Sequence, residues 1–266
     1  MTELTKRILF ALIAAPLFLL MLWLGGWYFK VLVVIIGLFI QREMMLMFQK
    51  TGHEQNAFAA YGLGLVTMLF FQLPHPLLIG FLIFLYLVTT ETLNLKPGHL
   101  DRMVSTLFCG LYAPFALLSL ILLREYGMEV TGFALAGSLI LVIWGTDIMA
   151  YIGGKRFGKN LLAPAISPGK TREGFYFGFL GGLLGLIMAS FLIPSYPYEF
   201  LYVLPIVIIV GFFGPVGDLA ESRMKRSAGL KDSSSILPGH GGVFDRFDAL
   251  LLASPAVYVY VVLILG

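Results

Sequence analysis

The chain has 266 residues, of which 59% are hydrophobic and only 12% are charged. A soluble domain usually has about a quarter of charged residues, so this composition excludes an ordinary soluble domain and indicates an integral membrane protein. The net charge is only +3, and the single cysteine, Cys109, excludes an intrachain disulfide and a cysteine-based metal site. Cys109 lies in an apolar run, which predicts a small buried side chain.

The first residues have the outline of a secretory signal. Lys6 and Arg7 precede an apolar run, but no small-x-small cleavage site follows and further apolar runs do. We therefore expect a retained first helix.

Nine apolar runs approach the length of about 20 residues that a helix needs to cross a bilayer. Each is predicted to be helical, because backbone groups cannot stay unpaired in lipid. The predicted fold class is therefore all-α, a polytopic membrane protein with about nine transmembrane helices. The runs are residues 8–25, 28–48, 57–73, 76–92, 103–123, 130–152, 174–193, 199–220 and 249–265.

No long polar linker divides the chain, so one integrated membrane domain is expected. Residues 1–128 would hold the first five helices. Residues 129–266 would form a catalytic region of four helices, with hydrophilic loops at 153–173 and 221–248. No internal repeat is visible, which disfavours an inverted-repeat transporter.

The Lys and Arg residues gather on one side of this topology. With nine spans, 16 of the 18 fall on the side of the N-terminus, and only Lys30 and Arg124 fall on the other. Cytoplasmic loops have the excess of Lys and Arg, so the N-terminus is predicted inside and the C-terminus outside. The two richest loops would then both lie on the cytoplasmic face.

Acidic residues flank these two loops. Asp218, Glu221 and Ser222 have i, i+3 and i+4 spacing, which places them on one helical face. Asp245 and Asp248 are also three residues apart. Acids at membrane depth are costly and usually mark a site, and carboxylate oxygens suit Mg²⁺. The alternative, ion pairing with the nearby Lys and Arg residues, stays open.

Three further acids lie outside the segments 218–222 and 245–248. Asp147 lies in the sixth predicted helix, four residues before Tyr151, and adds to the acidic group beside the loops. Glu43 and Glu91 lie near span ends, and a solvated or structural role is favoured for both. No pair of histidines has metal-ligand spacing, which argues against zinc.

Basic residues in the 153–173 loop suit a phosphate. Lys155, Arg156 and Lys159 follow a Gly-Gly pair, and Lys170 and Arg172 lie just before the seventh helix. Backbone amides at a helix start, together with Lys and Arg, bind phosphate well. Binding of anionic lipid headgroups is the alternative. The spacing of a P-loop is absent, so a P-loop NTPase is excluded.

The segment 222–248 combines cations, acids and glycines, a combination that suits a metal-bound polyphosphate. His240 could contact phosphate or close the turn, and Gly241 and Gly242 would let a nucleotide approach the backbone. In the seventh helix, Gly174, Gly178 and Gly182 have the spacing of a close helix contact, either an internal seam or a dimer interface.

These residues resemble the phosphatidate cytidylyltransferase family, also called CDP-diacylglycerol synthase. Further similar segments are Asp147–Gly154, Ser167–Gly174 and Asp218–Ser222, and one departure is Gly169, where many members have a second Lys. The resemblance is concentrated in the C-terminal half. The family signature is matched by Ser222, Met224, Lys225, Arg226, Lys231, Asp232, Ser234, Leu237, Pro238, His240, Gly241, Gly242, Asp245, Arg246, Phe247 and Asp248.

The resemblance implies a nucleotidyltransferase that converts CTP and phosphatidate to CDP-diacylglycerol and pyrophosphate in phospholipid biosynthesis. It implies Mg²⁺, with a second cation such as K⁺ left open, an inner-membrane location, a homodimer and no nucleic-acid partner. Metal ligands would be Asp218, Asp245 and Asp248, and Lys225 and Arg246 would complete the catalytic set. Substrate-binding residues would be Asp147, Lys170, Thr171, Arg172, Ser222, Arg226, Lys231, Asp232, His240, Gly241 and Gly242.

Other readings of the sequence remain. A CTP-dependent lipid kinase shares CTP and a lipid but transfers the γ-phosphate. A synthase acting on an archaeal ether lipid would share the headgroup chemistry. A CDP-alcohol phosphotransferase is disfavoured because its Asp-rich run is missing. An ion-coupled transporter using Asp147 and Asp218 is the alternative from another class, and the clustering of charges on one face argues against it.

Overall fold

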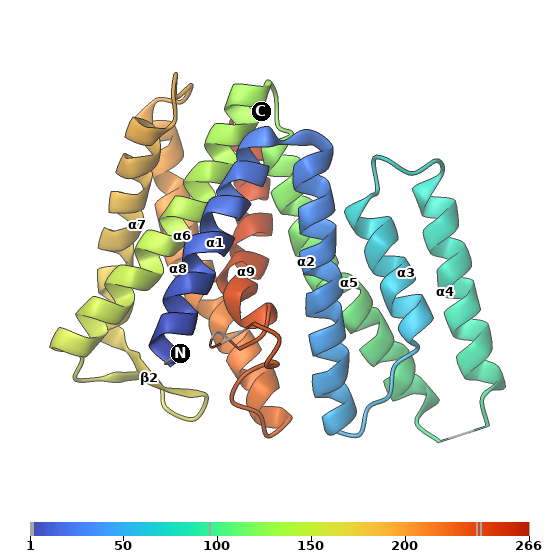
Figure 1. Ribbon diagram of the computed structural model, residues 1–266. Helices are drawn as coiled ribbons and strands as arrows, with labels where there is room; N and C mark the ends of the chain where they lie inside the picture. Colours follow the sequence, from blue (N-terminus) through green and yellow to red (C-terminus); the bar gives the residue numbers. More distant parts are fainter. Residues whose placement is uncertain (1–2, 96, 238, 240, 266) are drawn as a thin grey trace. The chain divides into compact units, whose positions relative to one another are not determined.

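A computed structural model of the chain (Figure 1) describes residues 3–95, 97–237, 239 and 241–265, with only the backbone for residues 3–11. The described residues form nine α-helices and one pair of short strands. The helices are α1 Glu3–Leu24, α2 Gly26–Lys50, α3 Ala57–Met68, α4 Pro76–Leu93, α5 His99–Arg124, α6 Glu129–Phe157, α7 Arg172–Leu192, α8 Phe200–Ser227 and α9 Phe244–Tyr260. A short π-helical turn, Val261–Leu265, continues α9.

Every predicted span has its helix within the described residues, which confirms a polytopic helical membrane protein. Within the described part of the chain, seven helices are long and apolar enough to cross a membrane. The exceptions are α1, of which the searched part is Leu12–Leu24, and α3. With 12 residues, α3 is about 18 Å long, less than the roughly 30 Å of a bilayer core. The predicted end at residue 73 was wrong: α3 ends at Met68. Its C-cap Leu69 has φ −105° and ψ 24°, outside the helical range, and residues 69–72 form turns before Pro74.

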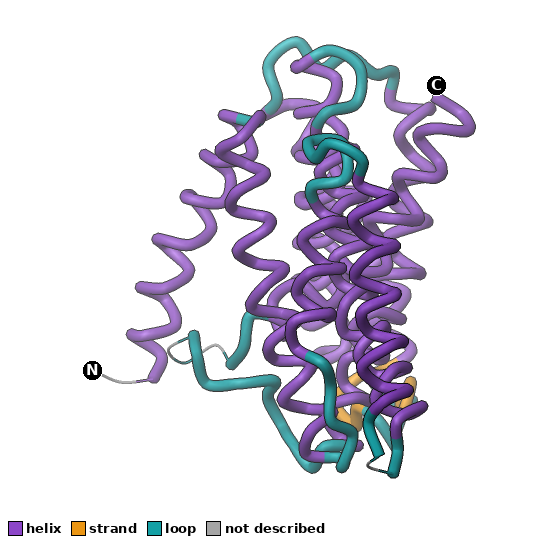
Figure 2. The backbone as a smooth tube through the Cα atoms, turned by 90° about the vertical axis from the view of Figure 1, so that its right-hand side faces the viewer, coloured by secondary structure: helices purple, strands orange, loops and turns teal. Residues whose placement is uncertain are grey.

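The strand pair is the element that the all-α expectation lacked. Strands β1 (Leu161–Ala163) and β2 (Ser167–Thr171) pair antiparallel, with Leu161 opposite Thr171. Figure 2 shows this pair in orange where the chain passes between two helices. Glu173 at the start of α7 holds the preceding loop, because its carboxylate accepts hydrogen bonds from Lys159 N at 3.0 Å and Asn160 Nδ2 at 2.7 Å. The hairpin therefore joins α6 to α7 in a fixed arrangement.

The chain divides into two compact units, each built from separate stretches. Helices α3 and α4 belong wholly to unit 1, and α6 and α7 belong wholly to unit 2. The domain boundary that the sequence suggested at residue 128 stays a prediction. Unit 1 is Met1–Leu17, Lys30–Leu118 and Met224–Arg246, and unit 2 is Phe18–Phe29, Ser119–Arg223 and Phe247–Gly266.

Unit 1 is held together by a buried amide as well as by apolar packing. Gln41 on α2 is fully buried, and its Nε2 donates hydrogen bonds to Ala60 O on α3 at 2.8 Å and to Cys109 O on α5 at 3.3 Å. Polar side chains stabilise helix pairs in this way in lipid, where hydrophobic burial alone gives little attraction. Cys109 is buried, as predicted.

Unit 2 is organised around the contact between α6 and α7, which Figure 1 shows side by side. A Cβ atom at Gly181 would collide with Gly145 O, one at Gly185 with Leu141 O, and one at Gly174 with Ala150 O. The α7 glycines therefore let two helix backbones touch. Of the two roles that the sequence left open for them, the structure gives the internal seam.

Candidate functional site

Three acidic side chains meet where α8 and α9 touch in unit 2. Asp218 and Glu221 on α8 and Asp248 on α9 each place one carboxylate oxygen within 4.8 Å of the others. The close approach depends on Gly217, where a Cβ atom would collide with the backbone O of Asp248 and lie 3.4 Å from Ala249 Cα. Three carboxylates this close repel one another unless a cation or protons compensate them.

Asp218 contacts both strand β2 and its own helix α8. Its Oδ2 lies 2.5 Å from Lys170 Nζ of β2, and its Oδ1 accepts a hydrogen bond from Ser222 Oγ at 3.2 Å. The side chains of Lys170 and Asp218 are 24% and 35% exposed, so a ligand can reach both. Asp248 is held more locally, since its Oδ1 accepts a hydrogen bond from Ala249 N at 2.7 Å.

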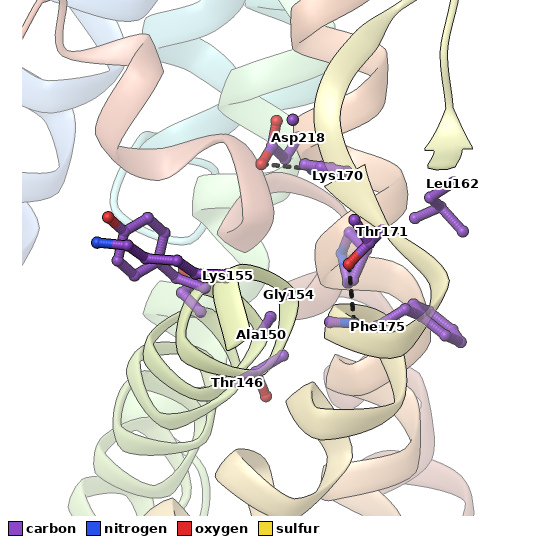
Figure 3. A pocket seen from close by; sticks show the side chains of 14 residues that line it. Thr146, Ala150, Gly154, Lys155, Leu162, Lys170, Thr171, Phe175 and Asp218 are labelled. Carbon is purple, nitrogen blue, oxygen red and sulfur yellow. Dashed lines mark hydrogen bonds and ion pairs between the residues drawn. The ribbon is translucent and has the colours of Figure 1, made fainter. Parts of the chain in front are cut away.

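A pocket of about 520 Å³ lies beside this ion pair and is bounded by α6, α7, α8 and the hairpin. That volume is within the usual range for small-molecule sites. Figure 3 shows Lys170 and Asp218 joined on one side of the pocket, with Lys155 and Thr171 among the other lining residues. The pocket is lined by Thr146, Asp147, Ala150, Tyr151, Gly154, Lys155, Leu162, Gly169, Lys170, Thr171, Gly174, Phe175, Pro215 and Asp218.

The N-terminus of α7 opens at this pocket. Thr171 is its N-cap, and Thr171 Oγ1 accepts a hydrogen bond from Gly174 N at 3.1 Å. Arg172 N donates to Asn160 O at 2.8 Å, which fixes the first turn to the preceding loop. The partial positive charge of a helix start, with Lys170 and Lys155 near it, suits an anion such as a phosphate. Nothing lies within 4 Å of the Cβ position at Gly169, so this exposed position has room for a side chain.

A second polar cluster, in unit 1, holds the loop between α8 and α9. Asp245, in the first turn of α9, accepts hydrogen bonds from Lys225 Nζ at 2.5 Å, Ser233 N at 2.9 Å and Gly242 N at 2.7 Å. Lys225 is buried and Asp245 partly buried. This aspartate and this lysine, both predicted as catalytic, therefore fix the loop's conformation.

Glu43 on α2 completes this second cluster. It is fully buried, and its carboxylate accepts hydrogen bonds from Ser233 Oγ, Ser234 Oγ, Val243 N and Phe244 N. The sequence favoured a solvated or structural role for Glu43, and the structure gives a structural one. No local signal could have revealed its partners, which lie 190 to 201 residues further along the chain.

The remaining predicted site residues are spread over the loop and the helix starts. Arg226 is exposed, and its Nη1 donates to Leu230 O at 2.7 Å. Arg172, Lys231, Asp232 and Arg246 are exposed. Gly241 has a φ of +79°, a conformation that favours glycine. His240 lies outside the described residues.

The structure thus sorts the predicted residues into two sets. Unit 2 brings together Asp218, Lys170, Thr171 and Asp147 around one pocket, with Ser222 and Asp248 beside Asp218. Unit 1 brings together Lys225, Asp245 and Gly242. Glu221 was not among the predicted site residues, although its spacing from Asp218 was a sufficient signal.

Known proteins resemble the chain over nearly its whole length. The model of the cytidylyltransferase family matches residues 5–264. The chain is 32% identical to the phosphatidate cytidylyltransferase of Bacillus subtilis, over 97% of both chains. It is 32% identical to the phosphatidate cytidylyltransferase of Synechocystis, over 98% of this chain and 97% of the relative. Its identity to that of Brucella abortus is 34%, over 98% and 94%. The similarity therefore extends well beyond the C-terminal half.

Proposed function

The chain belongs to the cytidylyltransferase family, and from this membership we propose that it transfers the cytidylyl group of CTP to phosphatidate, giving CDP-diacylglycerol and pyrophosphate. The observation that carries the proposal is the group of Asp218, Glu221 and Asp248 beside Lys170, at a pocket onto which a helix N-terminus opens. This arrangement has the charges that a reaction between two phosphate esters requires.

A divalent cation fits the acidic group. The three donors are carboxylates within 4.8 Å of one another, and Mg²⁺ binds through such hard oxygen ligands together with substrate phosphates. We assign Asp218, Glu221 and Asp248 as the residues that would hold it. When bound, Mg²⁺ would neutralise charge on the phosphate oxygens. Asp245 is proposed to hold the loop instead, given its bonds to Lys225 and Gly242. A second cation such as K⁺ stays a prediction.

The protein's own residues would bind and orient the substrates. Lys170 and the N-terminus of α7 would attract the phosphatidate headgroup into the pocket of unit 2, because both offer positive charge. Arg226, Lys231 and Arg246, all exposed, would bind the triphosphate of CTP. These contacts would position the reactants, which is the main contribution a protein makes to phosphoryl chemistry.

The reaction itself needs no covalent enzyme intermediate. A phosphate oxygen of phosphatidate would form a bond to the α-phosphorus of CTP, and the bond from that phosphorus to the oxygen bridging to the β-phosphate would break. The electron pair leaves with pyrophosphate, and no proton has to move in this step. An anionic nucleophile approaching an anionic phosphate must have its charge neutralised, which is the role proposed for the acidic group with its cation and for Lys170.

The location in the cell is proposed from the charge pattern. The excess of Lys and Arg on one side favours an inner-membrane protein whose N-terminus and site face the cytoplasm. Arg124, one of the two exceptions, is buried and donates from Nε to Leu22 O at 2.6 Å and from Nη2 to Trp23 O at 3.0 Å at the end of α1. A homodimer remains a prediction from the family, and the α7 glycines do not support it because they line the α6–α7 seam.

Transfer of a labelled phosphate tests the proposal. Purified protein in detergent would receive Mg²⁺, phosphatidate and CTP labelled at either the α- or the γ-phosphate. We expect α-label in the lipid product and one pyrophosphate released per lipid. Movement of γ-label into lipid would make the protein a CTP-dependent lipid kinase. No transfer with phosphatidate under any divalent cation would refute the proposed substrates.

A further inference from the structure

Both oxygens of the Glu43 carboxylate accept hydrogen bonds from the loop that leads into α9 and from the first residue of that helix. Its Oε1 accepts hydrogen bonds from Ser234 Oγ at 2.6 Å and Val243 N at 2.9 Å. Its Oε2 accepts from Ser233 Oγ at 2.9 Å and Phe244 N at 2.8 Å. All four donors are neutral groups, and the carboxylate lies at the start of α9, where the helix dipole favours negative charge.

The four donors come from the two ends of one loop. Ser233 and Ser234 lie on its first limb, and Val243 and Phe244 lie on its second. Further from Glu43, Leu237 N donates a hydrogen bond to Gly241 O at 3.0 Å, which joins the two limbs a second time. Glu43 therefore closes the base of a loop that begins at Ser233 and ends at Phe244, and it does so from a helix 190 to 201 residues earlier in the chain.

The loop is built around this carboxylate. A Cβ atom at Gly242 would collide with Ser233 Oγ and lie 2.5 Å from Glu43 Oε2. Ser233 Oγ is 2.9 Å from both Glu43 Oε2 and Asp245 Oδ2. A hydroxyl has one proton to donate, so the two carboxylates share a single donor. The position of Asp245 is therefore linked to that of Glu43 through Ser233.

We propose that Glu43 is a positioning residue: its buried carboxylate fixes the two limbs of the loop, residues 233–237 and 241–244, so that the cations beside its two ends are preset for a nucleoside triphosphate. Lys231 lies two residues before the first bonded serine, and Arg246 lies two residues after Phe244. The identity of the loop's ligand rests on the proposed function, whereas the fixing of the loop by Glu43 does not. Glu43 itself would touch no substrate.

The test compares Glu43→Gln and Glu43→Asp with a matched control. Glutamine has the same shape but only one acceptor oxygen, so two of the four donors would face an NH₂ group. Aspartate keeps the charge but is about 1.5 Å shorter, and should restore part of the function. The control is Glu91→Gln, because Glu91 is another buried acid of unit 1, at 4% exposure, and contacts Arg102 at 3.5 Å.

Two readouts separate positioning from general stability. The first is hydrogen–deuterium exchange of the peptide that spans residues 230–246, in full-length protein without substrate. Glu43→Gln should speed exchange there about tenfold or more, with the peptides of α6 and α7 unchanged. The second is the steady-state KM for CTP, which should rise about tenfold or more while kcat changes less. A loss of global stability would lower the active fraction and leave KM unchanged.

The expected pattern is a local change with Glu43→Gln, a smaller one with Glu43→Asp and none with Glu91→Gln. Unchanged loop exchange in Glu43→Gln, or a defect confined to kcat, would overturn the proposal. If the wild-type protein transfers no cytidylyl group, the proposed function fails, and the exchange measurement still decides whether Glu43 fixes the loop. If Glu43→Gln does not insert, Ser234→Ala removes one of the four donors and should raise KM for CTP in the same direction.

Discussion

Substitution of Gly217 by alanine should separate the acidic side chains while leaving each of them present. The added Cβ atom would collide with the backbone O of Asp248 and lie 3.3 Å from its carbonyl carbon. Backbone atoms cannot rotate away as the end of a side chain can, so α8 and α9 must move apart by about 1 Å to restore normal van der Waals contact. Overpacking of this kind costs about 1–3 kcal/mol, and a misplacement of about 1 Å at reacting groups can lower a rate about 100-fold.

Gly214→Ala is the matched control for Gly217→Ala, because it lies three residues earlier on the same helix. A Cβ atom there would lie 3.7 Å from Ala249 Cβ, an ordinary contact. The assay is CDP-diacylglycerol formation per folded protein, with folding judged by thermal unfolding in detergent. We expect a loss of about 100-fold in Gly217→Ala and near-normal turnover in Gly214→Ala. Wild-type turnover in folded Gly217→Ala would refute the idea that this helix contact sets the acidic group.

Two further substitutions test the pocket and the seam. Gly169→Lys would place a second cation in open space at the pocket and should lower KM for phosphatidate several-fold, measured with mixed micelles. An unchanged or higher KM would count against a phosphate subsite there. Gly181→Ala would push a methyl group against Gly145 O in the α6–α7 seam and should destabilise the protein by about 1–3 kcal/mol, measured as a lower Tm. The control is Gly80→Ala, whose Cβ would lie 3.7 Å from Val66 Cγ1 and which should leave Tm unchanged. Equal Tm values for the two variants would contradict the seam.

The sequence predicted the helices well because burial in lipid forces backbone groups to pair within each apolar run. It predicted helix ends less well. The polar end of α8 continues to Ser227, beyond the predicted residue 220, since hydropathy detects only the part of a helix that suits lipid. The β1–β2 hairpin was missed because strands of three and five residues have too little alternation to detect.

The site was predictable where its partners are close in sequence and unpredictable where they are distant. The i, i+3 spacing of Asp218 and Glu221 places both in one acidic group, and the structure adds Asp248 from the next helix. Spacing alone did not distinguish Asp245 from Asp248. Asp245 lies in the first turn of α9 and accepts bonds from loop amides, a role that depends on how the loop folds back. Glu43 lies outside the reach of any local pattern for the same reason.

Binding of Mn²⁺, observed by its electron paramagnetic resonance signal as it replaces Mg²⁺, tests the central claim most directly. That claim is that Asp218, Glu221 and Asp248 together hold the cation on which cytidylyl transfer depends. We predict saturable binding to the wild-type protein, weakened at least about tenfold in each of Asp218→Asn, Glu221→Gln and Asp248→Asn, and unchanged in Glu91→Gln. Wild-type affinity in all three site variants would contradict the account, and the cation would have to be sought elsewhere.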